Sequence, residues 1–476
     1  MKYDLVLKGG MVVDPLNHIE EVLDVGIIDG KIEKIGEIGD NQGKKVLYVN
    51  DNLILPGLVD SHVHVIKDGT GKAGYRMLVR AGVTTAFDFR GPIDAFEEEI
   101  IPYGQGLNVA VLNCIFNGRE MSQYDVPREE IYKEVRDSLE KGAIGIKIMG
   151  GHAPLTPKTT KNVIEITNEE GGYIAFHAGT SKHGSNIEGM EEAVHLANGL
   201  PLHIAHINSY CRGMIEHPLG EAKRALTLLK NSPNIVCESY LAPFNGTNGE
   251  LNEEGLPKSH VTRNCLKKLG YPVGKEGIKK ALLNHCAAVY TKVGEENQLI
   301  WGEEGYNLWE DKGSKVNMSF LVNSPVVAAA CAAEKDDKGH FVVNALSTDG
   351  GAIPRNFTLK YGLSLVAFGA LTLKEFAWKS SYAPAQLIGL KDKGHFSKGA
   401  DADIVVVDLH KKEAKMTIIN GKVCMMDGEL THEPGKILTT EKGESYLKEN
   451  HVPYEVIDLE RSVYRNGKDY LYRRGE

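Results

Sequence analysis

The sequence lacks the features that mark secreted, membrane-spanning and nucleic-acid-binding proteins. Its seven cysteines are odd in number and include no Cys-x-x-Cys pair, so we expect reduced thiols rather than a disulfide framework. No window approaches the roughly 20 apolar residues of a membrane helix, and Asp4 stands where a signal peptide would begin its apolar core. Because 55 basic residues face 64 acidic ones, the net charge of −9 does not favour nucleic acid. These absences predict a cytoplasmic protein without a nucleic-acid or membrane partner.

The composition that remains is typical of a soluble globular protein. The chain has 476 residues, of which 42% are hydrophobic and 25% charged, close to the averages for such proteins. Its 52 glycines exceed the usual share, which suits a fold with many tight turns between strands and helices. The length allows a large core and more than one domain.

The two ends of the chain share a β-rich pattern that the middle does not have. Apolar and polar positions alternate over residues 3–10 and 24–32, where Asp29-Gly30 marks a hairpin turn, and again over residues 399–423. Because a short hairpin module buries little surface alone, we expect the two ends to pair. This predicts a small β-sandwich domain of residues 1–54 and 393–430. Residues 431–476 would form an extension that packs on a neighbouring surface.

Between these ends, residues 55–392 alternate short β-rich runs with helical stretches. The eight candidate strands are residues 58–65, 83–89, 109–116, 144–149, 173–177, 202–207, 235–240 and 342–347. This order predicts parallel strands with crossover helices, and therefore a (β/α)8 barrel of the TIM type, although a doubly wound open sheet would give a similar pattern. About a hundred residues separate the last two strands, so we expect a large insertion at about 243–340.

The most informative segment is Pro56-Gly57-Leu58-Val59-Asp60-Ser61-His62-Val63-His64. Positions i and i+2 of a strand face the same side, so His62 and His64 project together and could share a metal ion. Both stand at the C-terminal end of an apolar run, where a barrel places its active site. The alternative interpretation is a pair of surface histidines on an exposed edge.

Other apolar strands also end in residues that could bind metal. Lys147 interrupts an apolar run, and it could either react with carbon dioxide to form a carbamate or be an ordinary paired or snorkelling lysine. His177 could be a ligand or a hydrogen-bonded core residue, and Asp349 could be a ligand or a turn residue before glycine. His203 and His206 are three residues apart, so the alternation of a strand predicts that at most one of them enters the barrel.

Together these motifs resemble the amidohydrolase superfamily, and within it the dihydroorotase and hydantoinase branch. The resemblance covers nearly the whole chain and rests on Gly9-Gly10 and on residues 55–64, 82–85, 384–390 and 398–408. The branch's pattern around its last histidine ligand matches Ala205-His206-Ile207-Asn208-Ser209, which favours His206 over His203. By position, the resemblance implies a metal-ligand set of His62, His64, Lys147, His177, His206 and Asp349.

The resemblance implies a metal-dependent hydrolase that cleaves a C–N amide bond. Its substrate would be a cyclic amide, such as a hydantoin or dihydropyrimidine, or an N-acyl amino acid. Two divalent ions, zinc before other metals, would be bridged by an N6-carboxylysine at Lys147 and would supply hydroxide near neutral pH, with Asp349 as the base. One alternative is a heterocycle aminohydrolase (deaminase), and another is a catalytically silent scaffold relative. Because oligomers are usual among the relatives, we expect a homo-oligomer that acts on a small molecule.

The sequence departs from the hydantoinase pattern in ways that bear on the substrate. His152 stands five residues after Lys147, where hydantoinases carry an oxyanion-binding tyrosine; it could donate in place of that tyrosine or simply face water. Gly350-Gly351 and the late insertion resemble N-acyl-D-amino-acid deacylases instead. Arginine matches a carboxylate bidentately, although a surface salt bridge is its ordinary role. The candidate substrate contacts are Arg90, Arg355, Asn113, Ser209 and Tyr210.

Overall fold

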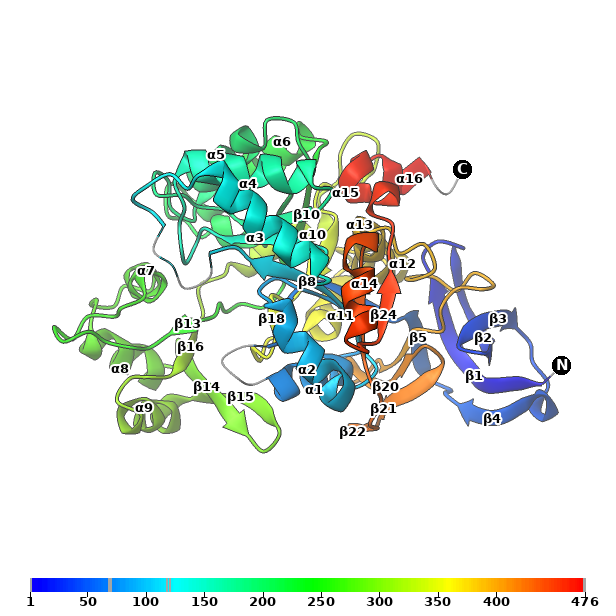
Figure 1. Cartoon of the computed structure of the whole chain (residues 1–476). Helices are drawn as coiled ribbons and strands as arrows, with labels where there is room; N and C mark the ends of the chain where they lie inside the picture. Colours follow the sequence, from blue (N-terminus) through cyan, green and yellow to red (C-terminus); the bar gives the residue numbers. More distant parts are fainter. Residues whose placement is uncertain (1, 67–70, 117–118, 120, 474–476) are drawn as a thin grey trace.

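The computed structural model of the chain describes residues 2–66, 71–116, 119 and 121–473. It has a central barrel, a sheet built from both ends of the chain on one side, and an inserted α/β unit on the opposite side (Figure 1). Within the described residues, no helix is both long and apolar enough to cross a membrane.

The barrel is a ring of parallel strands that one segment closes. In ring order the strands are β6 (Leu58–His64), β7 (Val83–Asp88), β8 (Asn108–Cys114), β9 (Gly145–Met149), β10 (Tyr173–His177), β11 (Leu202–Ile204), β12 (Ile235–Tyr240), β17 (Ala345–Ser347) and β18 (Gly350–Gly351). β17 pairs with β12, and β18, just beyond it in the chain, pairs with β6. The same segment therefore joins the two edges of the sheet, and the predicted (β/α)8 barrel is confirmed.

Helices form the outer layer of the barrel (Figure 1). Their sequences explain where they begin: α4 starts at Pro157 because the Thr156 hydroxyl accepts the Thr159 N–H, and it buries Val163 and Ile164 against the sheet. The barrel helices are α1 (Gly71–Arg80), α2 (Ile93–Tyr103), α3 (Arg128–Glu140), α4 (Pro157–Glu169), α5 (Ile187–Ala197), α6 (Pro218–Lys230), α10 (Pro325–Ala333), α11 (Thr358–Ala367), α12 (Leu373–Ala377) and α13 (Ala383–Leu387).

Both ends of the chain contribute strands to one nine-stranded sheet, as predicted. Asp29 and Gly30 join two of its strands with φ angles of 48° and 73°, the left-handed pair that a type I′ hairpin requires. β5 lies between the two ends, since it pairs with both β1 and β19. The strands are β1 (Tyr3–Asp14), β2 (Ile19–Ile28), β3 (Lys31–Gly36), β4 (Gly43–Tyr48), β5 (Asn52–Pro56), β19 (Ile404–Asp408), β20 (Glu413–Ile419), β21 (Lys422–Met426) and β22 (Glu429–Leu430).

The long segment between β12 and β17 folds as a unit with its own sheet and core. Four strands pair antiparallel in the order β13-β16-β14-β15. Leu266, Ile278, Val289 and Trp309 lie in a hydrophobic cluster separate from that of the barrel. The elements are β13 (Thr247–Asn248), α7 (His260–Lys268), α8 (Lys275–Leu283), β14 (Ala287–Val293), β15 (Glu296–Trp301), α9 (Gly302–Asp311) and β16 (Asn317–Phe320).

The C-terminal segment packs on the barrel. β23 (Lys436–Thr439) extends the barrel sheet by pairing with residues 108–110 of β8, before β8 begins to pair with β9 at Leu112. Tyr464 stacks on Tyr173 with 4.1 Å between ring centroids. The other elements are α14 (Glu441–Glu449), β24 (Tyr454–Val456), α15 (Val463–Asn466) and α16 (Tyr470–Arg473).

Candidate metal centre

Three of the predicted ligands meet where β6 and β17 end. The Asp349 Oδ1 atom lies 3.0 Å from His64 Nε2 and 3.3 Å from His62 Nε2. One ligand atom from each residue lies within 4.8 Å of the others, and all three residues are buried. Burial lowers the pKa values of His62 and His64, which keeps both imidazoles neutral. Two neutral imidazole nitrogens and one carboxylate oxygen form a donor set that suits a divalent transition metal.

A second pair of nitrogens converges beside this group. His177, at the end of β10, directs Nδ1 toward Nε2 of His206, and the two atoms are 3.2 Å apart. The rings of His206 and His62 stack with 5.2 Å between centroids. Burial lowers the pKa of His177 and of His206 well below the ordinary value, so both imidazoles are neutral and would not repel a cation. The arrangement suits a second metal ion beside the first.

Lys147 lies in the barrel interior, where its amine contacts an aromatic ring but no polar group of the described residues. The side chain on β9 is 1% exposed, and Nζ has no hydrogen-bond partner among the described residues. Nζ lies 4.6 Å from the centroid of the Phe89 ring. Burial lowers the pKa of Lys147 to about 8, despite the opposing charges of Asp349 and Glu238. A large share of the amine is therefore neutral near pH 8, which makes it a nucleophile rather than a fixed cation.

Glu238 connects the two histidine pairs and escaped the sequence analysis. It lies on β12, fully buried, and its Oε1 atom accepts the His62 Nδ1–H at 2.7 Å and the His206 backbone N–H at 2.6 Å. Oε2 accepts the Ser347 hydroxyl. Because Nδ1 of His62 donates, its Nε2 lone pair is free for a metal. A glutamate inside the apolar run Ile235-Val236-Cys237-Glu238 was the available signal.

Two buried aspartates hold the loops that carry the ligands. Asp60 accepts the Thr348 backbone N–H at 3.1 Å and its hydroxyl at 2.6 Å, which fixes the residue just before Asp349. Burial raises the pKa of Asp60 to about 7, even though these bonds oppose the rise. Asp88, at the end of β7, accepts three backbone N–H groups, those of Val65, Arg90 and Gly91.

The expectation that only one of His203 and His206 enters the barrel is wrong. β11 ends at Ile204, and His206 adopts a left-handed conformation with φ 41° and ψ 67°, so strand alternation does not extend to it. Both side chains are buried inside: Nδ1 of His203 hydrogen-bonds the Tyr173 hydroxyl at 2.7 Å, below the predicted ligands. Only His206 makes the close approach to His177.

The predicted substrate contacts separate into lining residues and structural ones. Arg90 and Arg355 line the cavity at the centre, as does His152, an exposed residue whose ring lies 5.2 Å from that of His177. Arg355 donates from Nε to the Asp349 carbonyl at 2.6 Å and pairs through Nη2 with Asp349 Oδ2 at 2.5 Å. Although burial acts the other way, the charge of Arg355 helps to hold the pKa of Asp349 well below its usual value.

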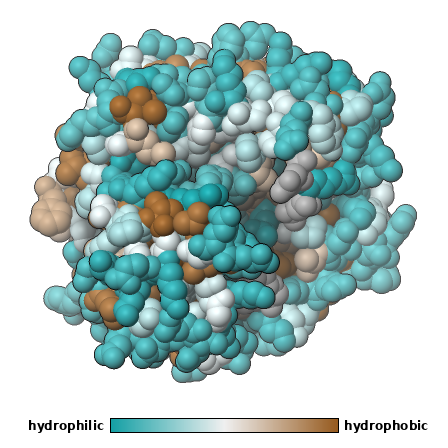
Figure 2. All heavy atoms as spheres, turned by 90° about the vertical axis from the view of Figure 1, so that its left-hand side faces the viewer, coloured by the Kyte–Doolittle hydropathy of each residue, from teal (hydrophilic) through white to brown (hydrophobic). Residues whose placement is uncertain are grey.

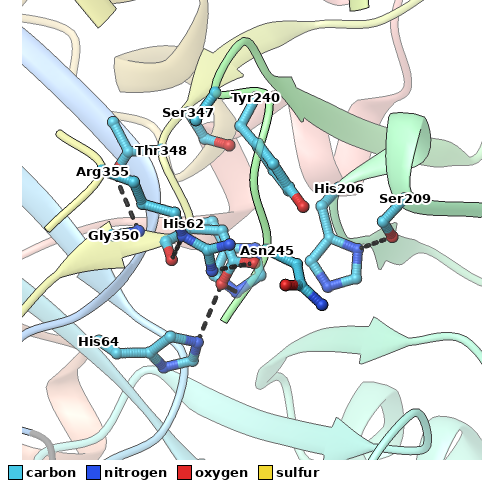
Figure 3. Close-up of polar contacts among 12 residues, drawn as sticks. His62, His64, His206, Ser209, Tyr240, Asn245, Ser347, Thr348, Gly350 and Arg355 are labelled. Carbon is cyan, nitrogen blue, oxygen red and sulfur yellow. Dashed lines mark hydrogen bonds and ion pairs between the residues drawn. The ribbon is translucent and has the colours of Figure 1, made fainter. Parts of the chain in front are cut away.

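Three other candidates have their polar atoms occupied. Ser209 hydrogen-bonds Nδ1 of His206 at 2.7 Å (Figure 3). The Tyr210 hydroxyl accepts the Ala178 backbone N–H at 2.8 Å and is fully buried. Asn113 is directed away from the centre, because its Oδ1 accepts the Ile93 N–H and its Nδ2 donates to Ser138. For Tyr210 and Asn113 these bonds indicate structural roles rather than the predicted substrate contacts.

Two cavities meet at the centre. The larger, of about 760 Å³, extends between the barrel and the insertion, and the smaller, of about 600 Å³, lies beside β10 and α7. The face that carries the insertion is mainly hydrophilic and is hollowed near its middle (Figure 2). Both cavities are lined by His152, His177, His206, Gly246, Asp349 and Arg355. The two cavities therefore share part of their lining at the predicted metal centre.

Comparison with known proteins agrees with this geometry. The model of the Amidohydrolase family matches residues 53–217 and 309–424. A dihydroorotase of Pelotomaculum thermopropionicum is 41% identical over 436 residues, 85% of this chain and 88% of the relative. An N-acyl-D-glutamate deacylase of Alcaligenes xylosoxydans xylosoxydans is 22% identical over 92% of this chain and 96% of its own.

Solved structures share the fold at low sequence identity. A D-aminoacylase structure has a TM-score of 0.64 at 16% identity and covers 92% of this chain and 100% of its own. A D-hydantoinase structure has a TM-score of 0.58 at 17% identity, with coverage of 91% and 98%. Since the family model matches more than half of the chain and a dihydroorotase is 41% identical to it, the chain belongs to the amidohydrolase family, the metal-dependent hydrolases of C–N bonds other than peptide bonds.

Proposed function

We propose that this chain binds two divalent metal ions, zinc before others, and uses them to hydrolyse an amide bond of a small molecule. The observation that carries the proposal is the convergence of the predicted ligands from five strands. His62, His64 and Asp349 form one donor group, and His177 and His206 form the other. Lys147 lies inside the barrel, where its amine has no hydrogen-bond partner among the described residues and its charge acts on His62 and His177.

Lys147 would join the two groups as a carbamate. Its neutral amine nitrogen adds to the carbon of carbon dioxide and loses one proton, which gives an anionic group with two oxygen donors. The lowered pKa of Lys147 favours this reaction, and the absence of any carboxylate partner for Nζ among the described residues leaves the amine available. Intact-mass measurement under non-denaturing conditions, with and without bicarbonate, tests for the added carbon dioxide. Lys147→Met should abolish the added mass and the second metal.

The residues of the chain would divide the chemistry among themselves. Divalent ions in such a site acidify a water molecule and polarise a carbonyl oxygen. Asp349 would accept the proton of the attacking water and deliver it to the departing nitrogen. Arg355 fixes Asp349 for this transfer through two bonds. His152, at the rim, would donate to the developing oxyanion.

A cyclic amide is the first candidate substrate. The support is the 41% identity to a dihydroorotase over most of both chains. Arg90 and Arg355 both line the larger cavity and would bind a carboxylate of the substrate. We also propose that the enzyme is a cytoplasmic homo-oligomer.

An N-acyl amino acid is the second candidate. Two cavities that meet at Asp349 could take the two sides of an open-chain amide, whereas a single compact ring needs only one. Gly350-Gly351 after Asp349 also resembles the deacylases.

One screen separates these possibilities. The zinc-reconstituted enzyme is assayed with dihydropyrimidines, hydantoins and N-acyl-D- and N-acyl-L-amino acids, and ammonia release from purines and pyrimidines is followed in parallel. Amide hydrolysis that Asp349→Asn abolishes at unchanged zinc content supports the proposal. Ammonia release without amide hydrolysis would favour the aminohydrolase alternative, and a protein that binds no metal would favour the silent scaffold.

A further inference from the structure

Three lysines of the insertion gather at the outer part of the larger cavity. Lys292 lies near the end of β14, Lys312 follows α9, and Lys315 precedes β16; all three line the cavity that contains Asp349. The register explains why they meet, because Tyr290 of β14 pairs with Asn317 of β16, which brings the end of one strand beside the start of the other. We call these three residues the lysine collar.

The protein offsets the charges of the collar only in part, since Lys315 acts on the Glu250 carboxylate and helps to lower its pKa. All three side chains are exposed, and none forms an ion pair within the part of the chain that the structure describes. The carboxylates that line this cavity are already occupied: Glu250 pairs with Lys258 at 2.7 Å, and Asp349 pairs with Arg355 at 2.5 Å.

The positive charge of the lysine collar is unexpected on a chain whose net charge is −9. Like charges placed together without counter-ions repel one another, so their grouping costs stability unless an anion binds there. The cavity of about 760 Å³ lies in the upper part of the range for drug-sized ligands and exceeds the needs of a bare five- or six-membered ring. The collar belongs to the insertion, and the family match breaks off between residues 217 and 309, which includes Lys292.

We propose that the lysine collar binds a second negatively charged group of the substrate. The preferred amide would then carry one carboxylate near Arg90 and Arg355 and another anionic group, at a distance set by the length of the cavity, against the collar. This inference rests on the proposed function for the position of the reacting bond. It adds that the insertion selects extended dianionic substrates over compact or neutral ones.

Binding measurements test the inference without turnover. The purified, zinc-loaded protein is titrated by calorimetry with α,ω-dicarboxylates from glutarate to sebacate and with monocarboxylates of equal chain length. At one chain length or more, the diacid should bind about tenfold or more tightly than its monoacid, and the preference should weaken as salt is raised. ω-Phosphonocarboxylates of the same lengths show whether the collar prefers a phosphonate to a carboxylate.

Variants assign the preference to the collar. Each single change Lys292→Gln, Lys312→Gln or Lys315→Gln should weaken diacid binding by up to about fivefold, as expected for exposed ion pairs, and leave monoacid binding unchanged. The triple variant should lose most of the preference. Lys267→Gln is the matched control, because Lys267 is an exposed lysine of α7 that lines neither cavity.

The outcomes separate this inference from the proposed function. A diacid preference that disappears in the triple variant supports the inference even if no amide is hydrolysed. Equal binding of diacids and monoacids at every length, or a preference that survives in the triple variant, overturns it even if amides are hydrolysed. If the proposed function and this inference are both correct, kcat/KM for an amide substrate with a distal carboxylate should exceed kcat/KM for the analogue with a carboxamide at that position. The triple variant should remove this difference.

Discussion

Glu238→Gln tests whether the metal centre depends on a carboxylate that binds no metal itself. Oε1 of Glu238 accepts both the His62 Nδ1–H and the His206 backbone N–H, and Oε2 accepts the Ser347 hydroxyl. Glutamine keeps the shape and one acceptor oxygen, and the Ser347 hydroxyl can turn to accept from the new amide. Burial raises the pKa of Glu238 to about 8, so above that pH the change removes a negative charge, and at any pH it largely preserves the packing.

The expected loss follows from what the charge does for His62. A carboxylate on Nδ1 fixes the tautomer that leaves Nε2 free and makes the imidazole a better ligand, and removal of such partners costs about 10–100-fold in metal affinity. We expect about tenfold for Glu238→Gln, or about 1.4 kcal/mol, because the geometry survives. Glu238→Ala should cost more, since it leaves the His206 N–H and the Ser347 hydroxyl buried without a partner.

The assay is competition for zinc with a chromophoric chelator, together with activity as a function of free zinc. If affinity is the only loss, excess zinc should restore most of the activity of Glu238→Gln. The matched control is Glu221→Gln, another fully buried glutamate, whose carboxylate accepts backbone N–H groups of Gly213 and Ile215 away from the centre. The reasoning is refuted if Glu238→Gln binds zinc as tightly as the wild type, or if Glu221→Gln weakens zinc binding equally.

Three further predictions concern packing, protons and metal. In Gly151→Ala a Cβ would lie 1.9 Å from Nε2 of His177, so the His177 ring must move and metal analysis should find one zinc ion fewer. Gly184→Ala is the control and should keep both zinc ions, because the space around Gly184 is open. Burial lowers the pKa of Lys379 to about 7, whereas that of an unfolded lysine is about 10.4. Between these pH values the unfolded state binds more protons than the folded state, so the free energy of unfolding should rise with pH by up to about 1.4 kcal/mol per pH unit. In Lys379→Met the urea midpoint should therefore change less between pH 7 and pH 10 than in the wild type. Zinc at a hundredfold excess over its Kd should add about 2.7 kcal/mol of stability, and equal thermal midpoints with and without chelator would contradict a native-state metal site.

The insertion explains how a common barrel could acquire its own specificity. Barrel strands fix the ligands near the axis, whereas loops beyond the strand ends tolerate added segments. Here the added segment folds around its own core, with Trp309 buried, and so presents its polar residues at defined positions. Asn297, on β15, ties the two units together by donating to the carbonyl of Ala352, close to Asp349.

Local sequence determined the features that depend on short-range periodicity. His62 and His64 face one side because they are two residues apart in a strand that the structure extends to His64. The strand–helix alternation predicted parallel strands with crossover helices, and closure of these strands into a barrel was decided by the pairing of β18 with β6. The Asp29-Gly30 turn specified its hairpin, because few residues adopt the left-handed backbone that a type I′ turn requires.

Tertiary structure decided everything that depends on which strand neighbours which. Glu238 became part of the centre only because closure of the ring brings β12 near β6, and the inward turn of both His203 and His206 required a strand that ends early. The convergence of the lysine collar depended on pairing between β14 and β16. Periodicity specifies the face on which a side chain lies, but its partners are set by long-range packing, which the spacing of residues along the chain does not encode.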